Sequence, residues 1–217
     1  MPFARHRRTP LFLSALIAAS LCAGIFLFEA HAMAGAPQLV TAGETLRGRF
    51  VQERSLAGFD KPLRTEGEFV LAPGTGLLWR GEKPFVSATV ITATGIVQFA
   101  GDQETMRLPA KQMPGMDRLY EVLSAALSGD VTPLRRTFSV NETSQSGHWR
   151  IALAPLSSGN APVAPIKSLT LTGEHFVDSV EVDRGNGDVD RITFLNQILS
   201  PTDLTDEEKS LFATLPR

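Results

Sequence analysis

The sequence is short of the residues that carry most covalent and metal chemistry. Its 217 residues include one cysteine, Cys22, four histidines and a single tyrosine. Cys22 lies in the first 32 residues, so the rest of the chain can form no disulfide and no thiolate metal site. Two histidines remain in that rest, His148 and His175, and we expect both in surface turns.

The chain also lacks an excess of positive charge. It has 21 basic against 23 acidic residues, and its first 32 residues hold three arginines but one glutamate, so the remainder is the more acidic part. Nucleic-acid binding needs clustered lysine and arginine on one face. The one basic doublet of the remainder, Arg135-Arg136, predicts a solvated strand face, and we therefore expect no nucleic-acid partner.

Motifs of catalysis and metal binding are absent from the sequence. There is no G-x-S-x-G and no H-x-x-x-H, and neither Gly74 nor Gly76 opens a phosphate-binding loop. Asp183, Asp188 and Asp190 flank a glycine turn, but their spacing misses the calcium-loop pattern and lacks its closing glutamate. We predict solvated turn carboxylates there, and no catalytic residue, no metal ion and no cofactor in the protein.

The N-terminus has the three parts of a secretory signal: a basic head, an apolar middle and a small-x-small exit. Basic residues at 5–8 precede an apolar run from Leu11 to Phe28, followed by Ala30-His31-Ala32 and Ala32-Met33-Ala34. We predict a signal peptide over residues 1–32, cleaved after Ala32 or Ala34, and a single domain over 33–217. An uncleaved membrane anchor is the alternative, because the run is just long enough to span a bilayer.

Short segments with period-two alternation fill most of the remainder, which is typical of half-buried strands. The last two flank Arg184-Gly185-Asn186-Gly187, a strong hairpin turn. Because strands and helices do not alternate, a parallel sheet is excluded, and we predict a mainly β fold of the α+β class, a large curled antiparallel sheet or open barrel. The segments begin near Leu46 and recur at 64–71, 77–80, 86–92, 96–99, 106–108, 136–140, 149–153, 166–172, 177–183 and 190–195.

Two helices are predicted beside these strands. Apolar residues at helical spacing lie between Pro114-Gly115 and Gly129-Asp130, which indicates an amphipathic helix over 116–127. Thr205-Asp206-Glu207-Glu208 is a capping box that begins a short C-terminal helix. We expect one or both helices to pack against the mouth of the sheet. Residues 33–43 are small and polar and predict a mobile or weakly helical leader.

Apolar side chains of common strand parity form the candidate binding surface. Two interpretations remain open: an ordinary packed core, or an apolar cavity of the kind with which small barrels hold ligands. The helix over 116–127 would accordingly be either a fixed plug or a lid. The strand residues are Phe50, Phe69, Leu71, Leu77 and Trp79, which we expect Val90, Val97 and Phe99 to join, and the helix adds Met116, Leu119, Leu123 and Leu127.

Several segments resemble the LolA-type periplasmic lipoprotein carriers. The resemblance rests on Phe50-Val51-Gln52, on Gly67-Glu68-Phe69-Val70-Leu71 with the turn at Pro73, on Leu77-Leu78-Trp79 and on Lys83-Pro84-Phe85. It implies an antiparallel half-barrel with a helical lid over an apolar concave face, in a periplasmic protein without cofactor or catalysis. It also implies acylated cargo, an inner-membrane exporter and an outer-membrane receptor as partners.

One departure from that family concerns the lid. The carriers place an arginine near the end of the second strand, where it bonds the lid, whereas this chain reads Leu71-Ala72-Pro73-Gly74. Lid closure must then be held in another way, which is typical of a divergent branch with a different acylated cargo.

The resemblance and the apolar surface together predict a monomeric periplasmic carrier. It would bind the acyl chains of a lipoprotein or of another acylated lipid or glycolipid, and move them toward the outer membrane. The alternative is a non-carrying accessory subunit that docks an inner-membrane exporter or an outer-membrane partner.

Overall fold

The computed structural model describes residues 36–112, 116–156, 166–201 and 204–215, with the backbone alone for residues 116–119. The predicted signal peptide and both of its cleavage sites lie outside these residues. Within them, no helix has the length and apolar character needed to cross a membrane.

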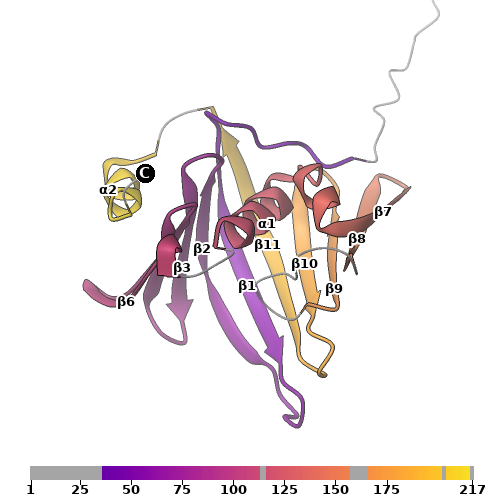
Figure 1. Ribbon diagram of the computed structural model, residues 1–217, viewed down its shortest axis with the longest axis horizontal. Coiled ribbons are helices and arrows are strands. Elements are labelled where there is room, and N and C mark those ends of the chain that lie inside the picture. The colour runs from indigo at the N-terminus through magenta and orange to yellow at the C-terminus, as the bar shows by residue number, and fades with distance from the viewer. Residues whose placement is uncertain (1–35, 113–115, 157–165, 202–203, 216–217) are drawn as a thin grey trace, which may run out of the picture. The chain divides into compact units, whose positions relative to one another are not determined.

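One open antiparallel sheet holds all eleven strands of the described residues (Figure 1). Chain neighbours pair along β1 to β6 and along β7 to β11, and β1 pairs β11 to join the two halves. Strands β6 and β7 form the two edges, so the predicted open, mainly β architecture is confirmed. The strands are β1 Thr45–Ser55, β2 Leu63–Ala72, β3 Gly76–Lys83, β4 Ser87–Thr92, β5 Gly95–Ala100, β6 Gln103–Pro109, β7 Phe138–Gln145, β8 His148–Pro155, β9 Ser168–Gly173, β10 Val177–Asp183 and β11 Val189–Ser200.

Two α-helices accompany the sheet at the predicted places. Helix α1 (Met116–Ser128) lies against β2, β3 and β10, whereas α2 (Asp206–Ala213) lies against β3 and β4. The predicted capping box of α2 is confirmed, because Thr205 and Glu208 bond each other's backbone amides. Short 3-10 helices occupy Ala110–Gln112 and Pro133–Arg136, so the prediction that Arg135-Arg136 belongs to a strand is wrong. Pro133, which fixes its own φ, favours that helical turn.

Both faces of the sheet are apolar, and each has its own helix. We call the face that carries Phe50, Phe69 and Phe194 the inner face; its buried cluster includes residues of α1. The outer face carries a smaller buried cluster, which includes Phe212 of α2 and Leu215 just after it. The strands between the two helices therefore bury side chains on both sides.

Three of the predicted binding residues lie on the outer face. Val90 and Val97 belong to the buried cluster beneath α2, and Phe99 packs against it. The register decides this: Val90 pairs with Leu78, whereas Leu77 of the inner face pairs with Ile91. The prediction that Val90, Val97 and Phe99 join the face of Phe50 is thus wrong, because both faces of β4 are apolar and the alternation alone does not say which one turns inward.

The segment before β1 crosses the C-terminal end of α1 in an extended conformation. We call residues 36–44 the N-terminal strap. In it the Val40 amide donates to the carbonyl of Ser128 at 2.9 Å and the Gln38 amide to that of His175 at 2.5 Å. The Val40 side chain is 4% exposed and belongs to the inner cluster. The described part of the leader is therefore not helical, and it connects α1 to the β9–β10 turn.

Candidate functional site

Four aromatic rings from four adjacent strands form the centre of the inner face. Phe50 on β1 and Trp79 on β3 stack with ring centroids 3.8 Å apart. Phe194 on β11 meets Phe69 on β2 edge-on at 5.1 Å and Trp79 at 6.1 Å. Such offset and edge-to-face contacts each add about 0.5–1.5 kcal/mol beyond area burial. We call these four residues the aromatic quartet.

Leu71 and Leu77 continue the inner face beside the aromatic quartet. They pair with each other across β2 and β3 and are almost fully buried. The structure thus brings five of the predicted strand residues together on one face: Phe50, Phe69, Leu71, Leu77 and Trp79. Trp79 alone among these five is half-buried, so its ring is the most accessible of the five side chains.

Helix α1 covers this face unevenly. Residues 125–128 at its C-terminal end are buried, whereas residues 120–124 are half-buried. Leu127 belongs to the inner cluster as predicted, and Val122, not singled out from the sequence, packs against it. Leu123 is half-buried, and the side chains of Met116 and Leu119 lie outside the described residues. The helix is therefore fixed at its C-terminal end and packed more loosely before it.

Polar contacts outside the core also hold α1. An ion pair joins Glu121 to Arg136 in the 3-10 helix that follows, and the strap bonds the carbonyl of Ser128. Gly129 has a φ of +74°, which ends the helix in the left-handed conformation that glycine adopts without strain. All these contacts lie on one side of the helix or at its end.

Tyr120 on α1 faces the turn between β2 and β3, near Pro73 and Gly74. A small cavity of about 410 Å³ is lined there by Tyr120, Pro73 and residues 39–42 of the strap. The Tyr120 hydroxyl is buried and has no hydrogen-bond partner among the described residues. Burial raises its pKa, and Ser124 and the Gly74 backbone lie close enough to oppose that rise without completing a hydrogen bond.

An ionic cluster around a buried carboxylate lies on the inner face where β1 ends and β11 begins. Arg54 and Arg184 both bond the carboxylate of Asp190, each at 2.5 Å in its shortest contact. Asp190 is 3% exposed, so the prediction that it is a solvated turn carboxylate is wrong. Burial alone would raise its pKa, but the hydrogen bonds from Arg54 and Arg184 outweigh burial and the pKa is lowered. Asp188 accepts from the Ala57 amide, so the β1–β2 and β10–β11 hairpins are joined.

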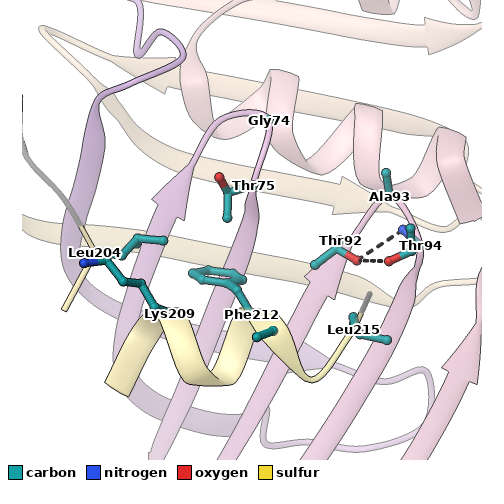
Figure 2. A pocket seen from close by; sticks show the side chains of 10 residues that line it. Gly74, Thr75, Thr92, Ala93, Thr94, Leu204, Lys209, Phe212 and Leu215 are labelled. Carbon is teal, nitrogen blue, oxygen red and sulfur yellow. Dashed lines mark hydrogen bonds between the residues drawn. The ribbon is translucent and has the colours of Figure 1, made fainter. Parts of the chain in front are cut away.

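A second cavity lies between α2 and the strand ends of the outer face (Figure 2). Its volume is about 530 Å³, and the Thr92 and Thr94 hydroxyls, 2.9 Å apart, bond each other at its rim. The helix is held over the outer face by Glu208, which forms two hydrogen bonds with Arg47, the shorter at 2.7 Å. The cavity is lined by Gly74, Thr75, Thr92, Ala93, Thr94, Leu204, Lys209, Phe212, Ala213 and Leu215.

The two histidines lie where the sequence placed them. His148 begins β8 next to the Ser146-Gly147 turn, and its Nδ1 lies 3.2 Å from the Glu174 carboxylate, with both side chains exposed. His175 is exposed in the β9–β10 turn. In the described part of the chain, no group of three or more His, Cys, Asp and Glu side chains could hold a metal ion.

One known protein family matches the part of the chain that forms the open sheet and α1. Residues 34–200 match the family described as outer membrane lipoprotein carrier protein LolA-like. The chain belongs to this LolA-like family. The match ends before α2, so the helix on the outer face lies beyond the matched residues, whereas the strand side of its cavity lies within them. Proteins of this family are carriers or binders.

The solved structures that match this chain are distant from it in sequence. A LolA superfamily protein from Nitrosomonas europaea is 8% identical, with 78% of this chain and 91% of that chain covered and a TM-score of 0.40. A putative outer membrane lipoprotein-sorting protein domain from Vibrio parahaemolyticus is 9% identical, with 79% and 92% covered and a TM-score of 0.41.

The Pseudomonas aeruginosa MucA/MucB complex is a further match, with 12% identity, 76% of this chain and 54% of that chain covered, and a TM-score of 0.42. No curated protein matches the sequence.

Proposed function

We propose that the protein is a periplasmic carrier that binds acyl chains between the inner face of its sheet and α1. The cargo is a lipoprotein or another acylated lipid or glycolipid, on its way to the outer membrane. One observation carries the proposal: the cluster that holds the aromatic quartet is covered by a helix that is buried over residues 125–128 and half-buried over residues 120–124. Membership of the LolA-like family supports it.

Movement of α1 is a condition of this function. Phe50 and Phe69 are each 1% exposed, so the quartet is packed and an acyl chain must displace part of the helix to reach it. Loss of contacts by Val122 and Leu127 would cost about 1.5–3 kcal/mol for each side chain. Burial of a chain of ~16 carbons gains on the order of 12 kcal/mol before entropy is subtracted. The gain from burying the acyl chain exceeds the cost of losing these two helix contacts, and that cost lowers an affinity that would otherwise prevent release.

Native mass spectrometry of the detergent-free protein, purified after export, is the direct test. We expect bound acyl species, whose masses would name the cargo. A protein that carries no lipid, and that binds none when incubated with acylated ligands, would contradict the carrier function. It would instead favour the accessory subunit, whose inner face is a permanent core.

A matched pair of variants tests where the cargo binds. Val122→Glu on α1 and Leu211→Glu on α2 each place a charge on a half-buried helix position that packs against an apolar cluster, on opposite faces of the sheet. We expect Val122→Glu to reduce acyl binding at least tenfold and Leu211→Glu to leave it within twofold. The reverse result would indicate that the cargo binds in the cavity beneath α2. Circular dichroism checks that both variants remain folded.

A further inference from the structure

Four large apolar side chains at the ends of two hairpins are exposed to solvent. Phe59 is 71% exposed, Leu63 61%, Phe85 80% and Val86 69%. Single exposed apolar residues are ordinary on protein surfaces, but neighbouring groups of this size mark interaction sites. We call these four residues the hairpin tips.

The hairpin tips lie at the same end of the sheet. Phe59 and Leu63 belong to the β1–β2 hairpin, whose ladder ends at the pair of Arg54 and Leu63. Phe85 and Val86 form the β3–β4 turn, next to the last pair of β2 and β3, Glu66 and Lys83. In Figure 1 the β1–β2 hairpin reaches the lower end of the view.

Backbone contacts hold the β1–β2 tip in place. The Phe59 amide donates to the Leu56 carbonyl at 3.1 Å, and the Ala57 amide donates to the Asp188 carboxylate at 2.9 Å. Pro62 limits the backbone of this loop, because proline fixes φ, and Pro84 does the same in the β3–β4 turn. The Phe59 ring is therefore presented to solvent by a constrained loop.

One of the hairpin tips, Leu63, lies on the same side of β2 as the inner face. Leu63, Thr65, Gly67 and Phe69 alternate along β2 on the side of the aromatic quartet, at about 6.8 Å for every two residues. Leu63 thus stands about 20 Å from Phe69 along the same side of the strand. A surface that binds the hairpin tips would lie at the end of the face to which we assign the cargo.

The charges near the hairpin tips are balanced. Asp60 and Lys61 adjoin Phe59, and Lys83 lies 3.7 Å from Glu66 beside Phe85. Aromatic rings flanked by lysines suit the boundary between headgroups and acyl chains, where the ring is buried and the ammonium stays in water. Because the charges balance, contact with such a surface would be driven by apolar burial and not by net charge.

We propose that the hairpin tips insert into the interfacial region of a lipid bilayer and bring the open end of the inner face to the membrane surface. Two separate rings that project from two turns need a partner that deforms around each of them, which a bilayer does. This membrane contact goes beyond acyl binding in the inner face and can be measured without any cargo.

Flotation with vesicles of phosphatidylethanolamine and phosphatidylglycerol, in a 3:1 ratio, tests the contact. We expect the detergent-free protein to float with the vesicles, also in 0.5 M salt, and Phe59→Ser/Phe85→Ser to bind at least tenfold more weakly. Ile198→Ser is the matched control, because Ile198 is 67% exposed and lies on β11 away from the tips. The proposal would be overturned if the native protein lost its binding in 0.5 M salt or if the double variant bound equally well. It would also be overturned if the native protein were a dimer held together by the two phenylalanines, so that the double variant became a monomer.

Fluorescence quenching at a single position distinguishes insertion of the hairpin tips from membrane binding through an N-terminal anchor. Phe85→Trp and Ile198→Trp each add one exposed tryptophan to the two of the native chain. With lipids brominated on the acyl chain, we expect the added fluorescence of Phe85→Trp to be quenched at least twofold and that of Ile198→Trp to be unchanged. Equal quenching of the two, or none at position 85, would overturn insertion of the tips and leave acyl binding by the inner face unaffected.

Discussion

Phe50 and Trp79 stack at 3.8 Å although their strands are not neighbours, because β2 lies between β1 and β3. The residue of β2 that pairs with both Phe50 and Gly81 is Gly67, which lies between the two strands that carry the stacked rings. A Cβ at Gly67 would lie 1.8 Å from the carbonyl oxygen of Arg80, so no other residue fits without a shift of the backbone. The close approach of β2 to β3 beside the aromatic quartet therefore depends on one glycine.

Gly67→Ala is expected to lower the free energy of unfolding by about 2–4 kcal/mol, since the clash is with backbone and cannot be relieved by a rotamer change. Gly101→Ala is the control: its φ is +59° and the space around it is open, so about 1 kcal/mol of backbone strain is expected. Urea unfolding followed by circular dichroism measures both. Equal losses would show that the backbone relieves the clash between position 67 and Arg80 at no extra cost.

Glu208→Gln tests the attachment of α2 through pH. Burial opposes ionisation of Glu208, but the hydrogen bonds from Arg47 and Thr205 outweigh it, and the pKa falls below the ordinary 4.5. A carboxyl with a lowered folded pKa stabilises the protein above its unfolded pKa and loses that effect as the pH falls through the folded value. We expect Glu208→Gln to cost about 1–2 kcal/mol at pH 7 and to lose less stability than the native protein between pH 5 and pH 3.

Glu207→Gln is the control for that measurement. Glu207 pairs with Arg80 but its side chain is 74% exposed, so we expect a change of at most about 0.5 kcal/mol. Urea midpoints at a series of pH values separate the two variants. Parallel profiles for the native protein and Glu208→Gln would contradict the role of the Arg47–Glu208 pair.

Val40→Asp is expected to loosen α1 without unfolding the sheet. Val40 is 4% exposed in the inner cluster and its segment bonds the end of α1, so a charge there should detach the N-terminal strap. Hydrogen exchange with mass spectrometry should show amides of α1 exchanging at least tenfold faster, while those of β1–β3 are unchanged. Leu39→Asp is the matched neighbour, 50% exposed, and should leave α1 as it is.

Tyr120→Phe removes a buried hydroxyl that has no hydrogen-bond partner among the described residues. Because an unsatisfied buried O–H is already a cost, its removal should leave stability unchanged or raise it by up to about 1 kcal/mol. Chemical unfolding of the native protein and the variant measures the difference. A loss greater than about 1 kcal/mol would mean that Ser124 or Gly74 bonds the hydroxyl and that Tyr120 fastens α1 to the β2–β3 turn.

Much of the site could be predicted because its signals are local. The parity of Phe50, Phe69 and Trp79 along their own strands placed each on an apolar face, and the helical spacing around Leu127 placed α1. Phe194 and Val122 were missed. Phe194 reaches the quartet only through the pairing of β11 with β1, which joins segments far apart in the chain. Val122 lies among apolar residues that do not mark one side of the helix unambiguously.

Alternation, turn residues and capping residues by themselves determined the strands, the two helices and the glycine hairpin before β11, because each depends on contacts between near neighbours in the chain. The tertiary structure decided which face each strand turns to which helix. Val90, Val97 and Phe99 lie beneath α2 because strand register and a second cluster place them there. It also buried Asp190 between two arginines from separate hairpins. Such contacts depend on pairing between strands that are far apart in the chain, and this pairing cannot be predicted from local sequence patterns.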